Sequence, residues 1–273
     1  MIDKNSRTKV LNSYSYRAPL FNKKGQATIF ILVGIAIIAL LAVLLFLRYG
    51  PDREGSGAKE EIEVKNYIEK CATENAVNIA DEMILHGGFI NSTNVKLFNN
   101  ISVEYLCRNN GYFKPCVNQH AALISEMEEE LVQHISPKLS KCFEDIDKQL
   151  KKKGANVKAE APQIRALFVY DKIILKIKRN MSLEYHDQKF QFSDFDSEVS
   201  HPIYNFGVVA RDIVNNEASY CYFENVGYVT LHTEFRIRRV ALSDETKIYQ
   251  ISHIPTGKDL TFAVRGCAVR AGL

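Results

Sequence analysis

The longest uninterrupted hydrophobic pattern in the chain lies near its N-terminus. Residues 27–47 are 21 consecutive positions without a charge, and only Thr28 and Gly34 dilute their apolar character. An α-helix of this length would measure about 31 Å, close to the hydrocarbon thickness of about 30 Å in a bilayer. A helix in a soluble core rarely stays apolar on every face over such a length. The pattern therefore predicts a transmembrane helix over residues 26–48.

The end of this segment distinguishes a retained anchor from a removable signal. A secretory signal has an apolar region of about 7–15 residues, followed by a small-residue cleavage site. Here the apolar run is longer and ends at Arg48-Tyr49, a pair typical of the membrane interface. Residues 49–58 then include Pro51 and three glycines, which favour a flexible linker. We therefore expect an anchor, a linker and a tethered head.

Residues 59–154 show the spacing of helices. From 59 to 86, apolar positions recur at approximately helical intervals, and Gly87-Gly88 supplies a stop signal. A second helical region covers about 119–153. We interpret Ser136-Pro137 as an N-cap followed by proline at the first helical position, so we expect two helices in this region.

Residues 155–273 change to the two-residue period of strands. From Ile173 to Tyr185, apolar and polar residues alternate, and only Arg179 interrupts the apolar side. This predicts a long strand with one buried face, paired to residues 164–169 through a short turn. A helix is expected within 200–216. A strand marked by the apolar positions 229, 231, 235 and 237 then begins an antiparallel meander.

These patterns together predict an α+β fold. A transmembrane helix precedes an ectodomain in which a helical segment packs with a mostly antiparallel sheet stabilised by disulfides. The expected divisions are a basic tail or leader, the anchor, the linker, a helical part and a β-rich part with one helix, at residues 1–25, 26–48, 49–58, 59–154 and 155–273.

Flanking charge predicts the orientation of the anchor. Residues 1–24 carry six basic residues and only Asp3 as an acid, whereas the flank after residue 47 is balanced. Basic flanks stay in the cytoplasm, so we expect a cytoplasmic N-terminus and an extracytoplasmic C-terminal domain in the cell membrane. The net charge of +3 comes from this tail, and it therefore gives no argument for nucleic acid as a partner.

The cysteines agree with that placement. All six follow the anchor, and an even number on the outer side is typical of a disulfide framework. No C-x-x-C or H-E-x-x-H spacing favours a metal, and we expect no cofactor. Cys107 and Cys116 flank the turn signal Asn110-Gly111 and could close a local bridge. Cys71 and Cys142 lie on the apolar faces of expected helices, and Cys221 and Cys267 on expected strands form the third pair.

The segment "KKGQAT" resembles the class III leader of archaeal pilin-like proteins. By this resemblance, a peptidase would cut between Gly25 and Gln26 and leave the apolar helix on the protein. The chain departs from the pattern in two ways. Phe30 stands where the family has an acidic residue, and the expected linker interrupts the helical stalk that pilins usually continue into the head.

Much of the chain resembles a family of membrane-anchored extracytoplasmic proteins from small-genome archaea whose activity is not known. The resemblance rests on "KKGQATIFILVGI", "VKNYIEKCATENA" with "HGGFI", "EMEEELVQHISPKLSKC", "IILKIKRNMSLEY" and "TFAVRG". This resemblance implies a membrane topology and an extracytoplasmic location. It also implies a Cys71–Cys142 pair, because cysteines recur at matching places in the family.

Two polar strand faces are the candidate binding surface. Its residues are Lys176, Lys178, His186, His232, Glu234, Arg236 and Arg238. Alternating charge of this kind also keeps an exposed sheet soluble. His120 and His134 are expected to face solvent, too far apart to share a metal. Three N-x-S/T sequons make Asn91, Asn100 and Asn180 candidates for glycosylation, which would make the chain a glycoprotein.

The sequence favours a non-enzymatic role in attachment, envelope structure or partner binding. No G-x-S-x-G, phosphate-binding loop or dinucleotide-binding motif occurs. The expected partners are membrane lipid along residues 27–47 and a surface or envelope protein, with the oligomeric state open. One alternative is a pilin-like subunit that assembles through its apolar helix. Another is an anchored envelope hydrolase, with His186, His232 and Glu234 converging in a pocket.

Overall fold

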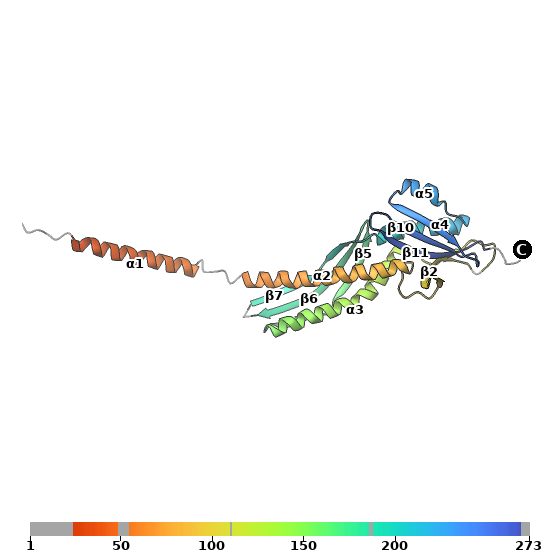
Figure 1. Ribbon diagram of the computed structural model, residues 1–273. Helices are drawn as coiled ribbons and strands as arrows, with labels where there is room; N and C mark the ends of the chain where they lie inside the picture. Colours follow the sequence, from red (N-terminus) through yellow and green to blue (C-terminus); the bar gives the residue numbers. More distant parts are fainter. Residues whose placement is uncertain (1–23, 49–54, 110, 186–187, 269–273) are drawn as a thin grey trace, which may run out of the picture. The chain divides into compact units, whose positions relative to one another are not determined.

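The computed structural model describes residues 24–48, 55–109, 111–185 and 188–268 (Figure 1). The chain divides into two compact units, Met1–Gly55 and Ser56–Leu273. Residues 1–23 of the expected basic tail and residues 49–54 of the expected linker lie outside the described residues. The candidate cleavage site between Gly25 and Gln26 lies at the start of helix α1 (Lys24–Arg48).

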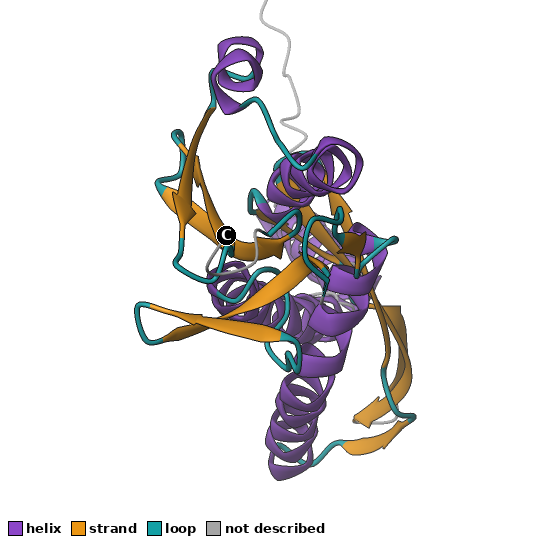
Figure 2. Ribbon diagram, turned by 90° about the vertical axis from the view of Figure 1, so that its right-hand side faces the viewer, coloured by secondary structure: helices purple, strands orange, loops and turns teal. Residues whose placement is uncertain are grey.

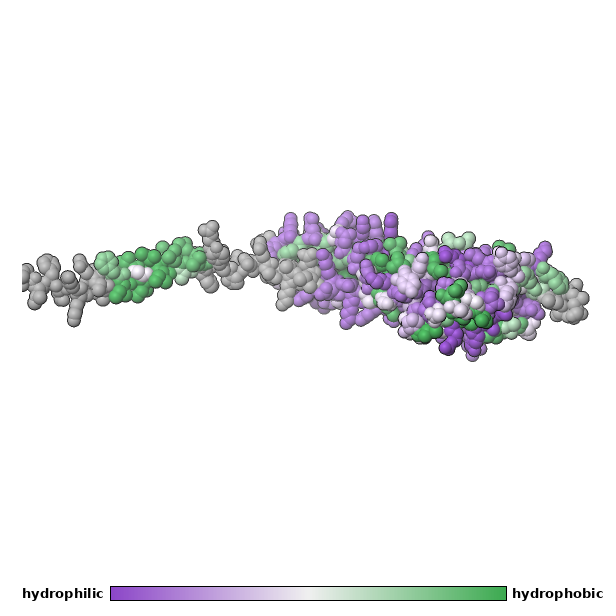
Figure 3. Space-filling view, turned by 90° about the horizontal axis from the view of Figure 1, so that it is seen from above, coloured by the Kyte–Doolittle hydropathy of each residue, from purple (hydrophilic) through white to green (hydrophobic). Residues whose placement is uncertain are grey.

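Apart from Gly55, the described part of the first unit is a single helix, α1 (Lys24–Arg48). Its large apolar side chains between Phe30 and Leu45 are each at least 51% exposed. Figure 3 shows hydrophobic residues along the visible side of this helix. Among the residues whose side chains are described, no helix is both long enough and apolar enough to cross a membrane. The transmembrane assignment therefore stays a prediction.

The second unit begins with helix α2 (Gly55–Leu85). Residues 55–58, which we expected in the linker, are thus already helical. The helix ends as the glycine pair predicts: Gly87 has a φ of 82°, and the amide of Gly88 donates to the carbonyl of Met83 at 2.8 Å. This 6→1 bond is typical of a Schellman motif.

Helix α3 (Leu123–Lys152) is continuous and contains Pro137, so the predicted division into two helices is wrong. The hydroxyl of Ser136 does not cap a helix but donates to the carbonyl of Val132 at 2.6 Å. A proline inside a helix costs about 3 kcal/mol. That cost is outweighed because one buried stripe runs through the proline. Its members are Leu123, Met127, Leu131, Ile135, Leu139, Phe143, Ile146 and Leu150.

A six-stranded sheet has the order β1-β2-β11-β10-β9, with β3 beside β2. Its strands are β1 (Val95–Phe98), β2 (Ile101–Arg108), β3 (Val117–Asn118), β9 (Phe235–Ala241), β10 (Lys247–His253) and β11 (Lys258–Arg265). The predicted antiparallel meander is confirmed in β9, β10 and β11. The β2–β11 pair is parallel and joins the two halves of the chain.

The second sheet is built around one long strand. Strand β6 (Lys172–Tyr185) confirms the predicted alternation, and it pairs antiparallel with all four other members. These are β4 (Asn156–Ala159), β5 (Gln163–Val169), β7 (Gln188–Asp194) and β8 (Ser197–Ser200). Strands β4 and β5 pair one after the other along one edge of β6. Strands β7 and β8 pair along its opposite edge, so the sheet is effectively three strands wide. The fold is α+β with mostly antiparallel sheets.

Two shorter helices complete the unit. Helix α4 (Ile203–Tyr220) confirms the predicted helix, with its inner face buried. Helix α5 (Asn225–Leu231) occupies positions where we expected a strand, so that prediction is wrong. The carboxylate of Glu224 accepts from the amides of Val226 and Gly227, which caps a helix. Leu231 is 83% exposed, so its apolar character does not reflect a buried strand face.

The helices and one face of each sheet share a single core. Side chains of α2, α3, α4, β6 and β10 belong to one buried cluster. Figure 2 shows helices in the middle of the unit with strands on either side. A small separate cluster on the opposite face of the six-stranded sheet contains Val103, Tyr105, Ile248 and Ala263.

Three disulfides confirm the predicted cysteine pairs. Cys71–Cys142 joins α2 to α3 with a Cα–Cα distance of 6.6 Å. Cys107–Cys116 closes the loop between β2 and β3 at 5.4 Å. Cys221–Cys267 has a Cα–Cα distance of 5.9 Å, but neither cysteine lies on a strand as expected. Cys221 caps the C-terminus of α4 and Cys267 follows β11, both with left-handed backbone.

Candidate functional site

The residues of the predicted binding surface lie on two separate sheets. Lys176 and Lys178 are on β6, whereas Arg236 and Arg238 are on β9. His232 and Glu234 precede β9, with 3.8 Å between Nδ1 and Oε1. His186 lies outside the described residues. The structure therefore does not place the described residues of the predicted binding surface on one common face.

Several of these side chains are engaged locally. The ammonium of Lys176 lies 2.6 Å from the carboxylate of Asp196, and this hydrogen bond raises the pKa of Lys176. Arg238 donates through Nε and Nη2 to the side-chain oxygen of Gln250 on the neighbouring strand. Such pairs are typical of a solvated sheet face.

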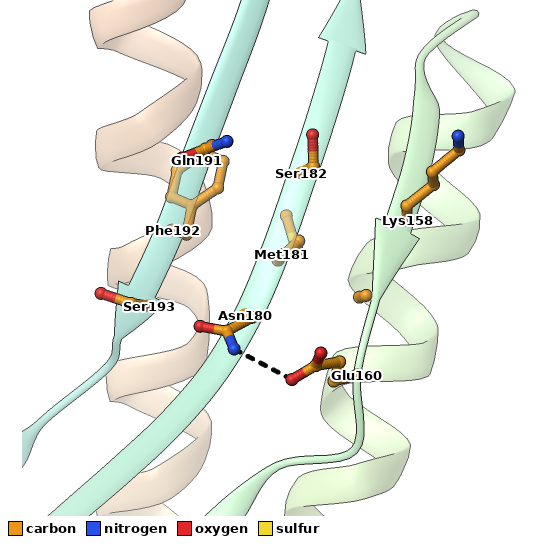
Figure 4. Close-up of a pocket in the computed structure, with 9 residues that line it drawn as sticks. Lys158, Glu160, Asn180, Met181, Ser182, Gln191, Phe192 and Ser193 are labelled. Atoms are coloured by element: carbon orange, nitrogen blue, oxygen red, sulfur yellow. Dashed lines mark hydrogen bonds between the residues drawn. The ribbon is translucent and has the colours of Figure 1, made fainter.

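A groove lies instead over the middle of the five-stranded sheet. It has a volume of about 690 Å³ and is lined by strands β4, β6 and β7 (Figure 4). The lining residues are Lys158, Ala159, Glu160, Asn180, Met181, Ser182, Gln191, Phe192 and Ser193. Apart from Asn180, marked by its sequon, sequence reasoning singled out none of them.

Irregularities on both edges of β6 produce this groove. Pro162 separates β4 from β5, because proline cannot donate to the ladder. On the other edge, the pairing of β6 with β7 shifts register between Lys178 and Met181. Both breaks occur at the level of Arg179. The one polar residue on the apolar side of the predicted strand was therefore the sequence signal for this site.

Arg179 holds the irregular segment against helix α3. Its Nη1 and Nη2 donate to the two carboxylate oxygens of Asp147 at 3.1 and 2.7 Å. Its Nε donates to the carbonyl of Glu160 at 2.9 Å, and the guanidinium lies 4.6 Å from the ring of Phe143. The sheet is thus fixed to the helix at the level of the groove by a buried cation whose three nitrogens all donate hydrogen bonds.

The groove offers hydrogen-bonding groups of mixed polarity. Figure 4 shows Asn180 and Glu160 pointing toward one another, and Nδ2 of Asn180 donates to Oε2 of Glu160 at 2.9 Å. Ser182, Gln191 and the ammonium of Lys158 add further donors and acceptors. The described lining residues supply amide, hydroxyl, carboxylate and ammonium groups. The arrangement suits binding through hydrogen bonds.

All three sequon asparagines are exposed. Asn100 lies in the β1–β2 turn, where Asn99 and Asn100 both have positive φ, as a type I′ hairpin requires. The side-chain nitrogen of Asn91 lies 3.1 Å from Nε2 of His134. Glycosylation at these positions stays a prediction.

His120 does not face solvent as expected. Its Nδ1 lies 2.6 Å from Glu126 and its Nε2 3.4 Å from Glu104, and its ring stacks on Phe89 with 4.3 Å between centroids. Burial alone would lower the pKa of His120. The hydrogen bonds and charges of the two carboxylates prevail and raise it. Because both ring nitrogens already contact carboxylates, the cluster is better suited to joining β2 to α3 than to acting on a substrate.

The buried residue His201 connects the start of α4 to α2. Its Nε2 lies 2.9 Å from Asp81, and its Nδ1 accepts from the amide of Ile203 at 3.1 Å. Burial lowers the pKa of His201. Within the described residues, no group of three or more metal-ligating side chains is arranged to hold an ion.

Comparisons with known proteins identify no relative. No protein-family model matches the chain, and no curated protein and no solved structure is significantly similar to it. The resemblance to the archaeal membrane-anchored family stays a prediction.

Proposed function

We propose that this chain is a single-pass cell-surface protein that binds a partner without catalysing a reaction. In this proposal α1 is the anchor, the N-terminus is cytoplasmic and the second unit lies outside. The observation that supports the extracytoplasmic location is the pairing of all six cysteines into three disulfides. Disulfides persist in oxidising compartments, and they are rare in the cytosol.

The exposed apolar side chains of α1 support its proposed role as the membrane anchor. Its large apolar side chains from Phe30 to Leu45 are exposed all around the helix. In water, such a helix would carry a large energetic cost, because each buried CH₂ is worth about 0.8 kcal/mol. The basic residues that precede it favour a cytoplasmic N-terminus.

The groove over β4, β6 and β7 supports a binding role. A volume of about 690 Å³ is within the range of small-molecule and peptide sites. Its polar lining is held in place by the Arg179–Asp147 pair, which favours a preformed site. The groups in the groove can orient a ligand or partner segment, whereas they do not form a nucleophile–base pair.

The intact mass of the protein extracted from native membranes tests this proposal. The sample is divided and alkylated with and without prior reduction. We expect a mass that retains residues 1–25 and six alkylated thiols only after reduction. A membrane-impermeant amine reagent applied to whole cells should label lysines of the second unit and none in residues 1–24.

Two results would change the proposal. A mass that begins at Gln26 would favour the pilin-like alternative, in which the cut leaves α1 as an assembly helix. Six thiols alkylated without reduction would contradict the extracytoplasmic placement.

Variants of Ser182 and Gln191 test the groove. Their substitution by alanine should weaken partner binding and leave the disulfides and the thermal transition unchanged.

A further inference from the structure

A second pocket, separate from the groove, contains an arginine that has no anionic partner among the residues that the structure describes. The pocket has a volume of about 400 Å³ and is lined by Asn94, Arg108, Asn109, Val117 and Gln119. These residues come from the segment before β1, the end of β2 and the region of β3. Among the described residues of this lining, Arg108 is the one that carries a charge.

The guanidinium of Arg108 is held in a fixed orientation but is incompletely bonded. Its Nη1 donates to the side-chain oxygen of Asn94, and its central carbon lies 4.7 Å from the ring centre of Tyr105. Its Nε is buried and has no acceptor among the residues that the structure describes. A buried donor without an acceptor costs about 1–3 kcal/mol, more for a charged group.

Two other arginines in the structure use hydrogen bonds that Arg108 does not make. Arg179 uses Nε and both terminal nitrogens, and Arg238 uses Nε and Nη2 together on Gln250. In Arg108 the terminal nitrogen that is already engaged is Nη1. The edge formed by Nε and Nη2 is one of the two edges with which a guanidinium binds both oxygens of a carboxylate or phosphate.

Two arginines lie at or beside the pocket. In the described part of the chain, Arg108 has no carboxylate partner. A second cation, Arg265, lies next to the pocket, and its Nη1 donates to the carbonyl of Asn109 at 2.8 Å. The charge of Arg108 is therefore balanced only by the neutral oxygen of Asn94 and the face of Tyr105.

We propose that this pocket binds an oxyanion, either a carboxylate or a phosphate group, through the Nε–Nη2 edge of Arg108. The side-chain nitrogen of Asn94 supplies a further donor, and Nε2 of Gln119, which already donates to the carbonyl of Val117 at 2.8 Å, has a second N–H. The volume of the pocket accommodates a small acid or the charged end of a larger ligand. This site requires no contribution from the groove over β4, β6 and β7.

The experiment uses the full chain in detergent micelles with acetate and inorganic phosphate as probes. Unfolding is followed by scanning calorimetry while each probe replaces chloride at constant ionic strength. We expect the midpoint temperature to rise by several degrees and to level off, because an anion that binds only the native state stabilises it by mass action. A larger response to acetate identifies a carboxylate ligand, and a larger response to phosphate identifies a phosphate ligand.

Arg108→Lys keeps the positive charge and removes the bidentate edge. This variant should bind either probe at least about tenfold more weakly, which follows from the loss of one charge-assisted bond. Arg238→Lys is the matched control, because the same edge of Arg238 is already occupied by Gln250. It should respond to the probes as the unmodified chain does.

An equal response in Arg108→Lys and the unmodified chain would overturn the proposal. An unchanged midpoint temperature when either probe replaces chloride would overturn it as well. If Arg108→Lys does not fold, Asn94→Asp provides a second test. A carboxylate at position 94 would neutralise Arg108 from within the chain. We expect this variant to unfold at a higher temperature without any probe and to lose the probe response. A probe response like that of the unmodified chain would contradict the site.

Discussion

Arg179 on β6 contacts both carboxylate oxygens of Asp147 on α3, at 3.1 and 2.7 Å. The side chains are 8% and 17% exposed, so the pair is largely shielded from water. It joins the sheet to the helix directly beneath the candidate groove. The alternation of β6 would otherwise place an apolar residue at position 179.

Asp147→Ala should lower the free energy of unfolding by about 3–5 kcal/mol, because it leaves a buried guanidinium without its counter-ion. Arg179→Met should cost less, since methionine fills a similar volume and restores the apolar alternation of β6. In the double variant, the loss should be smaller than in Asp147→Ala alone. Thermal unfolding followed by circular dichroism measures all three. Losses below about 1 kcal/mol in both single variants would mean that the pair behaves as a surface ion pair.

Pro137→Ala should raise the stability of the protein by about 1–3 kcal/mol. In the continuous helix α3, alanine restores an interior hydrogen bond and relieves the clash of the proline ring. Ser136→Ala is the control and should change stability by less than about 0.5 kcal/mol, because Ser136 bonds back to Val132 and does not cap a helix. If Ser136→Ala instead costs about 1 kcal/mol and Pro137→Ala does not stabilise, the chain has two helices here.

Stability should fall as the pH rises above about 6.5, owing to His120. Its folded pKa is raised above its ordinary value, so the protonated ring stabilises the fold fully below the unfolded pKa. That contribution is lost as the pH rises through the folded pKa. His120→Gln should remove this decline, which a series of unfolding midpoints between pH 5 and 9 would reveal. An unchanged slope in the variant would assign the decline to another group.

His201 should act with the opposite sign. Its folded pKa is lowered by burial, so its neutral form stabilises the fold, and this contribution diminishes as the pH falls below the ordinary value of 6.5. His201→Asn keeps a polar side chain beside Ile203 and should flatten the acid side of the same profile. His120→Gln should leave that acid side as it is, which separates the two histidines.

The disulfides should differ in their contribution to stability. Cys71 and Cys142 are 71 positions apart, whereas Cys107 and Cys116 are 9 apart. In the chain-entropy model, closing the longer loop stabilises by about 4 kcal/mol and closing the shorter by about 2.5 kcal/mol. The paired alanine variant at 71 and 142 should therefore have the lower unfolding midpoint. The reverse order would show that the burial of Cys107 and Cys116 outweighs loop length.

The local rules of the sequence predicted helices α1, α2 and α4, strands β5 and β6, and the meander of β9, β10 and β11. They did not predict β1, β4 or β8. The three expected cysteine pairs are formed, although the Cys71–Cys142 pair also rested on the family resemblance. A helix or a half-buried strand repeats its burial every few residues, so β6, α4 and the face of α3 are visible in the spacing of apolar residues. Gly87-Gly88 ends α2 because glycine readily takes the positive φ that this terminus needs.

Tertiary structure decided what depends on distant parts of the chain. The helix continues through Pro137 because its buried stripe packs on both sides of the proline, a gain that no local propensity contains. The parallel pairing of β2 with β11 and the groove above Arg179 bring together residues that are not neighbours in sequence. The absence of an acceptor at the Nε–Nη2 edge of Arg108, among the described residues, likewise follows from the packing and not from the local sequence. Local periodicity determines which face each element buries, and packing alone determines which elements meet there.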